Sequence, residues 1–304
     1  MRKDIIFFDY GKKDGEWVPN RFGGKVFQYA FFLVRKKMNL NVDYDISLLK
    51  HQNQHNGYEL ERIFDKESRS NCLNFFCLRV LYYAKCHSNL ACFKLLIRVA
   101  NWLGMELFID SIPSIYTNIF STHKKNFFLG YWQTEKYFCH IEKEIQATFE
   151  FKRELLSPET ARFLRRIIET NSVSIHIRRG DYLSEINQGL YGGICTEMYY
   201  AKAITYICNK IDQPSFFVFS NEIDWVKNNV DIPNPTYIDF NNGADSWQDM
   251  FLMSQCKHNI IANSSFSWWG AWLNRNTNKI VITPSRFINL EEDSDIIPDT
   301  WIRI

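Results

Sequence analysis

The stretch SIHIRRGDY, from Ser174 to Tyr182, reads as a strand with one polar face. Successive side chains of a strand point to opposite faces, so Ser174, His176 and Arg178 share a face. A central strand of a parallel sheet is normally apolar on both faces. Here the polar face gains charge toward the carboxyl end, which is where ligands bind in open α/β sheets. The stretch therefore predicts a parallel sheet with a charged ligand site at its edge.

The segments after this strand repeat one pattern, in which short apolar runs alternate with helical segments. The predicted strands are 173–179, 215–221, 235–240, 258–263 and 279–284. This alternation favours right-handed βαβ units and a parallel, Rossmann-like sheet. We therefore predict a C-terminal domain at 155–304. The N-terminal domain, 1–154, is predicted to be largely helical with some α/β structure, and to include a helix from about Val26 to Lys37.

The composition of the 304 residues excludes several classes of protein. Apolar residues make up 46% of the chain, which is enough for a substantial core. The net charge of +2 gives no reason to expect nucleic acid as a partner. None of the eight cysteines forms a CxxC pair, which argues against a zinc ribbon. The N-terminus lacks the pattern of a signal peptide, so we expect a cytoplasmic protein.

The segment 68–105 is basic, with five Lys or Arg and no acidic residue. Its apolar residues recur at helical spacing, and the first set is Leu73, Phe76, Cys77, Val80, Leu81 and Ala84. Charged residues interrupt it too often for a transmembrane span. Two interpretations stay open: a solvated basic face on core helices, or a peripheral surface attracted to anionic lipid at the inner membrane. The same helices also offer a surface for a homo-oligomer.

Two arginines end the predicted strand 173–179, and they point to an anionic ligand. Gly180 permits a tight turn after Arg178 and Arg179, and Asp181 follows it. Arginines beside such a turn can present planar, bidentate donors to a phosphate or pyrophosphate. The alternative is a buried Arg–Asp pair that only fixes the loop.

A second candidate anion site lies at IIANSSFSWWGAW, residues 260–272. The predicted strand ends near Asn263, and Ser264 or Ser265 would cap the helix that follows. Free N–H groups at a helix N-terminus favour an anion, although a plain cap is the alternative. The preceding helix carries Asp249, whose carboxylate can accept hydrogen bonds from the N1–H and N2–H groups of guanine.

Two common phosphate-binding devices are missing, because the chain has no GxxxxGK[ST] loop and no GxGxxG after a strand. Asp-x-Asp pairs occur at Asp43/Asp45 and Asp293/Asp295, but neither follows a convincing buried strand. We interpret both pairs as surface charge, and we predict no metal site and no cofactor. A diphosphate bound by arginines and a helix N-terminus needs no metal.

The motif H-x-R-R-x-D at His176–Asp181 is similar to the signature shared by α-1,2- and α-1,6-fucosyltransferases. The chain resembles the bacterial α-1,2-fucosyltransferases of glycosyltransferase family 11 over most of its length from Phe27. The supporting segments are FQYA at 27–30, LGYWQTEKYF at 129–138, FFVFSN at 216–221 and the run 249–274. The resemblance implies an α/β, two-domain, GT-B-like glycosyltransferase fold.

The resemblance also implies a reaction, which is inverting, metal-independent transfer of L-fucose from GDP-β-L-fucose to the 2-hydroxyl of a β-galactoside. The acceptor would be a lactose-like or lipid-linked glycan. Arg178 should contact the β-phosphate, with Arg179 supporting the loop or the donor; Asp181 and Glu185 are the candidates for a general base. The implied donor-binding residues are His176, Arg178, Arg179, Asn221, Asp249, Ser264, Ser265 and Phe266.

The chain departs from the family pattern at two places. Gly24 and Lys25 stand where Asn-Gln is expected, and Asn221-Glu222 stands where an acidic pair is common. Two alternatives to the fucosyltransferase therefore stay open. One is a non-catalytic nucleotide- or glycan-binding protein on the same fold, and the other is a related transferase with another sugar donor.

Overall fold

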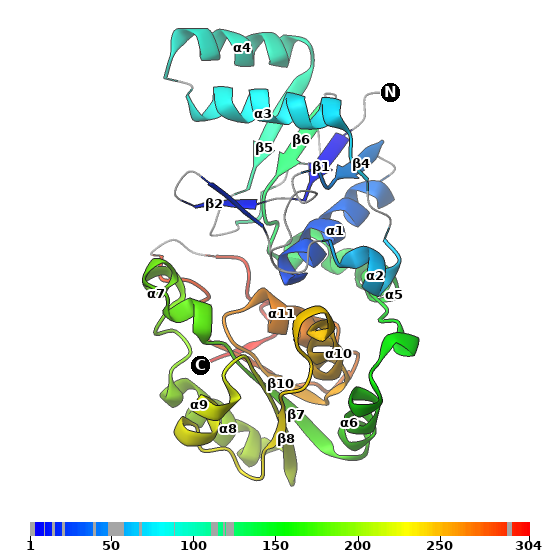
Figure 1. Cartoon of the computed structure of the whole chain (residues 1–304), viewed down its shortest axis with the longest axis vertical. Helices are drawn as coiled ribbons and strands as arrows, with labels where there is room; N and C mark the ends of the chain where they lie inside the picture. The colour runs from blue at the N-terminus through cyan, green and yellow to red at the C-terminus, as the bar shows by residue number, and fades with distance from the viewer. Residues whose placement is uncertain are drawn as a thin grey trace. The chain divides into compact units, whose positions relative to one another are not determined.

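The structure is a computed structural model in which two compact units are described, Met1–Glu150 and Phe151–Ile304. The described residues are 4–8, 10–13, 16–19, 22–38, 41–47, 58–66, 69–87, 89–110, 115–117, 119, 125–290 and 294–304. The boundary between the units lies four residues before the predicted one at 154/155. Each unit is an α/β structure with its own parallel sheet (Figure 1).

The N-terminal unit is built on a four-stranded parallel sheet in the order β4-β1-β6-β5. Its elements are β1 (Asp4–Phe7), β2 (Tyr10–Lys13), β3 (Glu16–Pro19), α1 (Phe22–Lys37), β4 (Val42–Asp45), α2 (Leu60–Phe64), α3 (Cys72–Cys86), α4 (Ala91–Trp102), β5 (Met105–Ile109), β6 (Lys125–Leu129), the 3₁₀ turns η2 (Glu135–Tyr137) and η3 (Cys139–Ile141), and α5 (Glu142–Thr148). The prediction of a largely helical unit with some α/β structure did not specify this sheet. The helix expected from Val26 begins four residues earlier, at Phe22.

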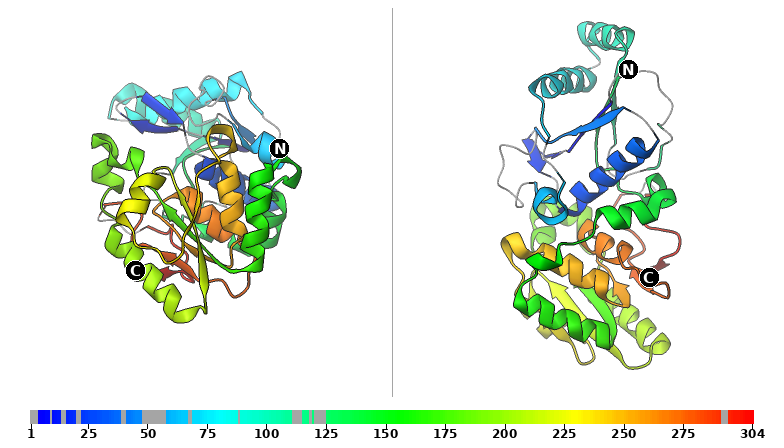
Figure 2. Two further views of the ribbon diagram at one scale, coloured as in Figure 1. Left: turned by 60° about the horizontal axis from the view of Figure 1, so that its bottom comes forward. Right: turned by 90° about the vertical axis from the view of Figure 1, so that its right-hand side faces the viewer.

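The strands of this sheet place their side chains alternately on two helical layers. Phe127 belongs with Leu81 of α3 to one core cluster. Its neighbour Phe128 faces the other way, with its ring centroid 5.6 Å from that of Phe31 on α1. Figure 2 shows the strands of this unit between α1 and the pair α3 and α4. The two central strands, β1 and β6, are thus buried on both faces, as parallel strands normally are.

A buried ion pair joins α1 to the sheet. The guanidinium of Arg35 lies 2.5 Å from the Asp4 carboxylate, and both side chains are buried. The second oxygen of Asp4 accepts hydrogen bonds from the backbone and side-chain N–H groups of Asn126, at 3.0 Å each. Because burying charges is costly unless their hydrogen bonds are satisfied, this network fixes how α1 lies against β1 and β6.

One Asp-x-Asp pair is not the surface charge that the sequence predicted. Asp45 is buried at the end of β4, where its carboxylate accepts from the N–H groups of Ser47 and Asn71. Its role here is to hold two loops together. Asp293 lies outside the described residues. Among the residues that are described, no group of three His, Cys, Asp or Glu side chains is arranged to hold a metal ion.

The C-terminal unit contains a six-stranded parallel sheet in the order β12-β11-β10-β7-β8-β9. Its elements are η4 (Arg153–Leu155), α6 (Pro158–Glu169), β7 (Asn171–Ile177), η5 (Gly180–Leu183), α7 (Glu185–Tyr191), α8 (Glu197–Lys210), β8 (Pro214–Ser220), α9 (Ile223–Asn229), β9 (Thr236–Ile238), η6 (Gly243–Asp245), α10 (Trp247–Gln255), β10 (His258–Ile260), α11 (Ser265–Trp272), β11 (Val281–Thr283) and β12 (Ile302–Arg303). The Rossmann-like sheet is therefore confirmed, with one additional edge strand, β12, that the sequence did not predict.

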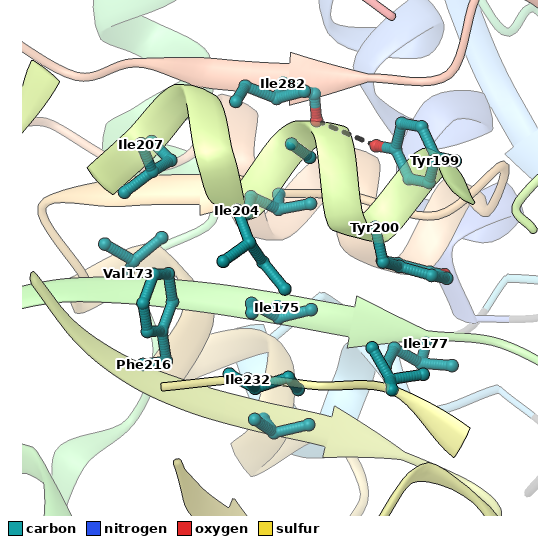
Figure 3. Close-up of a cluster of buried hydrophobic side chains, with 14 of the residues drawn as sticks. Val173, Ile175, Ile177, Tyr199, Tyr200, Ile204, Ile207, Phe216, Ile232 and Ile282 are labelled. Carbon is teal, nitrogen blue, oxygen red and sulfur yellow. Dashed lines mark hydrogen bonds between the residues drawn. The ribbon is translucent and has the colours of Figure 1, made fainter. Parts of the chain in front are cut away.

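The predicted alternation along β7 is also confirmed. Ile175 and Ile177 face α8, where they pack with Tyr200 and Ile204 in one buried cluster (Figure 3). On the opposite face the Oγ atom of Ser174 accepts a hydrogen bond from the side chain of Asn259, at 2.7 Å. Burying each of the large apolar side chains contributes about 1.5–3 kcal/mol, so the α8 face anchors β7 while the other face stays polar.

Candidate active site

The candidate site lies where the strand order of the C-terminal sheet reverses. From β7 the chain adds β8 and β9 on one side, and then β10, β11 and β12 on the other. Ligands of open α/β sheets bind outside the carboxyl ends of the strands at such a switch point. Arg178, Asn221 and Asn263 follow β7, β8 and β10 at this edge. The structure thus gathers most of the predicted site residues at one edge.

Arg178 is half-buried in the loop after β7, beside the ring of Tyr182. Its guanidinium carbon lies 5.8 Å from the ring centroid of Tyr182. The hydroxyl of Tyr182 donates a hydrogen bond to the backbone carbonyl of Asn263, at 3.0 Å. The side chain of Asn263 in turn donates to the carbonyls of Tyr191 and Phe287. Tyr182 therefore ties the arginine loop to the loop after β10, a role that the sequence did not reveal.

Arg179 points to a different set of partners. Its Nε atom lies 3.2 Å from the carboxylate of Glu222, and its guanidinium carbon lies 3.4 Å from the ring centroid of Trp225. Its backbone N–H donates to the Oδ1 atom of Asn221, at 3.1 Å. Of the two roles left open for Arg179, these contacts favour support of the loop. Asn221 contributes to the same support.

Gly180 is the residue that lets this loop turn. Its φ is +55°, and a Cβ atom there would lie 2.3 Å from the Nδ2 atom of Asn221. We expect Gly180→Ala to lower the free energy of unfolding by about 1–3 kcal/mol and to reduce turnover, because the loop that carries Arg178 must shift. Thermal unfolding and kcat of the purified variant measure the two effects.

Gly189 of α7 offers the matched control, because a Cβ atom there meets no heavy atom within 4 Å. Gly189→Ala should leave stability unchanged or raise it by about 0.5–1 kcal/mol, since alanine is favoured in a helix. Equal effects of the two substitutions would show that the turn at Gly180 has no special importance.

His176 is buried on the polar face of β7. Its ring centroid lies 5.8 Å from that of Phe266, at the start of α11. Burial and, to a smaller extent, the charge of Arg178 lower the pKa of His176 to about 3, so its imidazole is neutral near pH 7. Within the described residues its Nδ1 atom has no hydrogen-bond partner. A neutral ring with an unused nitrogen is suited to a single hydrogen bond with a ligand.

The helix start predicted to bind an anion is present, and Ser264 is its cap. The Oγ atom of Ser264 accepts from the backbone N–H of Phe266, at 3.3 Å, and α11 begins at Ser265. Further along, the indole of Trp268 is buried and donates to the carbonyl of Ile296. The N-terminus of α11 is thus held rigidly beside His176, as a preformed anion site requires.

Asp249 lies on α10 and is half-buried. Its carboxylate accepts from the side chain of Asn241, at 2.8 Å, and Asn241 accepts from the hydroxyl of Thr160. Burial, with a smaller contribution from the negative charge of Asp239, raises the pKa of Asp249 to about 8 against the lowering effect of the Asn241 hydrogen bond. At neutral pH the free protein therefore carries mostly the protonated acid.

The carboxyl edge of the N-terminal sheet also carries a fixed turn, inside the segment LGYWQ. Gly130 has φ +152° and lies so close to Asp110 that a Cβ atom would meet its backbone oxygen at 2.6 Å. Trp132 adopts φ 54°, donates its N–H to the Asp110 carboxylate at 2.7 Å, and stacks on Phe31. A strained, buried turn at the end of β6 persists because the surrounding contacts hold it.

The sequence profile of glycosyl transferase family 11 matches residues 18–304. The chain belongs to this family. It is 40% identical over 186 residues to an alpha-1,2-colitosyltransferase of Escherichia coli, covering 58% of this chain and 62% of that relative. It is 30% identical over 146 residues to galactoside alpha-(1,2)-fucosyltransferase 1 of Ateles belzebuth, covering 45% of this chain and 40% of that relative. The chain thus spans less than two thirds of the length of these relatives.

The fold of this family 11 chain is similar to that of a solved glycosyltransferase. The fucosyltransferase NodZ from Bradyrhizobium superposes with a TM-score of 0.50 at 11% identity, covering 89% of this chain and 92% of that one. The predicted two-domain, GT-B-like α/β fold is therefore confirmed, as is the predicted family.

The candidates for the general base are two carboxylates, Asp181 and Glu185. Asp181 lies in η5, and its side chain is outside the part of the chain that the structure describes. Glu185 is exposed in the first turn of α7. Both residues directly follow the loop that carries Arg178. Their role as general base stays a prediction.

Proposed function

We propose that this protein transfers L-fucose from GDP-β-L-fucose to the 2-hydroxyl of a β-galactoside, with inversion and without a metal ion. The observation that carries the proposal is the convergence of Arg178, His176 and the start of α11 at the switch point of a family 11 sheet. An arginine and a helix N-terminus at such an edge suit a diphosphate. The α-1,2-fucosyltransferase relative supports the donor and the linkage.

The chemistry needs stabilisation of the leaving group. As the bond between fucose and the β-phosphate oxygen breaks, negative charge builds on GDP. Arg178 and the N–H groups at the start of α11 are donors that are already in place, so they stabilise this charge without reorganising. The acceptor hydroxyl attacks the opposite face of the anomeric carbon, which turns the β-linked donor into an α-linked product. Its proton passes to Asp181, to Glu185 or to an oxygen of the departing diphosphate.

The N-terminal unit is the proposed acceptor side. Its strand order also reverses, between β1 and β6, and the fixed turn at Gly130–Trp132 lies at that edge. Lys25, one of the departures from the family pattern, is buried in α1; burial lowers its pKa to about 8 against the opposing effect of Glu59. A lactose-like or lipid-linked β-galactoside would bind here.

A second candidate donor is favoured by one observation, the 40% identity to a protein named alpha-1,2-colitosyltransferase. Colitose is L-fucose without its 3-hydroxyl group. A site that hydrogen-bonds a hydroxyl rejects the analogue lacking it by about 10⁴-fold or more, whereas an apolar pocket discriminates by only about 10²-fold. The two donors are therefore separable by their kcat/KM values.

The deciding experiment is GDP release from GDP-fucose and from GDP-colitose, with and without lactose, in EDTA throughout. We expect lactose-dependent release from GDP-fucose. Preference for GDP-colitose would establish the second candidate. Binding of GDP with no release from either donor would indicate a non-catalytic binding protein, and release only when EDTA is omitted would contradict the metal-independent reaction.

A further inference from the structure

The helix α4 lies almost wholly outside the core of its unit. Of its 12 residues only Ala100 is buried. Trp102 is 83% exposed and Leu95 is 62% exposed. On α3, Leu73 and Phe76 are 68% and 64% exposed. The interpretation of this segment as core helices is therefore wrong for α4, and for the first turns of α3.

The exposed apolar residues of α4 form one stripe. Leu95, Val99 and Trp102 are spaced at i, i+4 and i+7, so they share a face of the helix. Lys94 and Arg98, both exposed, are themselves four residues apart and run along the side of this stripe. An apolar stripe bordered by basic residues and containing a tryptophan is typical of helices that lie in a membrane interface.

This surface is held in place by its own unit. The α3–α4 pair, drawn in cyan in Figure 1, closes through Tyr83 and Phe93, whose ring centroids are 5.4 Å apart. The ammonium of Lys85 donates to the carbonyl of Leu107 on β5, at 3.0 Å, and Leu81 packs in the core of the sheet. The stripe is therefore held in a fixed position by contacts within its own unit.

The charge of the segment favours one occupant. Residues 68–105 contain five basic and no acidic residue. A second copy docked through the same face would set basic residues against basic residues, because a two-fold interface pairs a patch with itself. An anionic bilayer surface instead attracts each basic residue and accepts the apolar stripe. No helix in the described part of the chain is long and apolar enough to cross a membrane.

We propose that the α3–α4 surface docks on an anionic lipid bilayer. Leu95, Val99 and Trp102 enter the boundary between headgroups and acyl chains, while Lys94 and Arg98 contact the anionic headgroups. This docking is independent of the proposed transferase reaction, since it uses no residue of the candidate active site.

The test is flotation of the full chain with vesicles of equal parts phosphatidylglycerol and phosphatidylcholine, and with vesicles of phosphatidylcholine alone. We expect binding to the anionic vesicles, weakened at high salt because the charges are screened. Lys94→Gln/Arg98→Gln should lower the partition coefficient about 25-fold, at about fivefold per basic residue. Leu95→Gln/Trp102→Gln should abolish binding.

Matched controls lie on the C-terminal unit. Lys202→Gln/Lys210→Gln removes two exposed basic residues of α8, and Ile168→Gln replaces an apolar residue of α6 that is 59% exposed. Both controls should bind vesicles like the unchanged protein, and all variants should keep its melting temperature. GDP release from the same variants without vesicles should be unchanged, which separates this proposal from the proposed reaction.

Three results would overturn the docking proposal. The first is no binding of the unchanged protein to anionic vesicles at low salt. The second is an equal loss of binding in the test and control variants. The third is a stable dimer, without vesicle binding, that Leu95→Gln/Trp102→Gln converts to a monomer, because a second copy would then be the occupant.

Discussion

Replacing Arg178 by alanine is expected to lower kcat by about 10²–10³, by analogy with the loss of one donor to a developing oxyanion. The residue follows the polar face of β7 at the switch point, where the proposed β-phosphate lies. Its contribution grows as charge builds on the leaving group, so the loss should appear in kcat as well as in kcat/KM. Steady-state kinetics with GDP-fucose and lactose measure both constants.

Two further substitutions make this prediction sharper. Arg178→Lys should also be poor, because an ammonium cannot replace the bidentate fork of a guanidinium. Arg165→Ala removes an exposed arginine of α6 and should leave kcat unchanged. Near-normal turnover in either Arg178 variant would refute the role assigned to this residue, provided that its melting temperature matches that of the unchanged protein.

The C-terminal sheet could be predicted from the sequence because its signals are strong. β7 and β8 are each seven residues long, and their apolar runs alternate with helices. The strands of the N-terminal sheet are four or five residues long, and β1 is followed by the hairpin of β2 and β3 rather than by a helix. Length alone does not decide the outcome, since β9, β10 and β11 have only three residues each and were predicted. What the N-terminal strands lack is the regular alternation with helices that marks the C-terminal ones.

Helical periodicity also left the orientation of α3 open. The predicted apolar set included Leu73 and Phe76, which are exposed, whereas Leu78, outside the set, is buried. A helix with apolar residues on more than half of its surface has no unique buried face, so packing against the sheet decides which residues are covered. The excess of apolar surface is itself the feature that suggests a docking role.

The sequence predicted those residues of the candidate site whose side-chain chemistry is unusual for their position. His176 and Arg178 stood out because charged residues are rare on a central parallel strand. Tyr182 and Asn263 did not, because the bridge between their loops is a hydrogen bond to a backbone carbonyl, which any residue can offer. The contacts of Arg179 with Glu222 and Trp225 likewise could not be predicted from the sequence.

Guanosine affinity is expected to rise about 50-fold between about pH 6 and pH 8, through Asp249. The N1–H and N2–H groups of guanine donate hydrogen bonds, so they bind the ionised carboxylate. With its pKa raised to about 8, Asp249 is ionised in about 1% of molecules at pH 6 and in about half at pH 8. The apparent dissociation constant is the intrinsic one divided by that fraction. Guanosine is the probe because it carries no phosphate that titrates in this range.

Two substitutions separate this effect from other titrations. Asp249→Asn should lose the pH dependence together with most of the affinity, because the amide has a single acceptor oxygen and sets its NH2 donor against the second N–H of guanine. Asp239→Asn removes the neighbouring negative charge that raises the pKa of Asp249, so its affinity should rise at lower pH. Guanosine binding that is independent of pH in the unchanged protein would remove Asp249 from the guanine site.

Ionisation of Asp249 should have opposite effects on the stability of the free protein and on guanosine binding. Because its pKa is raised above the ordinary value of 3.8, folding favours the protonated acid. Its contribution to stability is therefore complete below about pH 4 and is lost as pH rises toward about 8. Asp249→Asn mimics the protonated acid, so the variant should be more stable than the unchanged protein at pH 8 while binding guanosine less. A residue with only a structural role would not give this pair of opposite changes, which thermal unfolding and calorimetry at pH 8 would detect together.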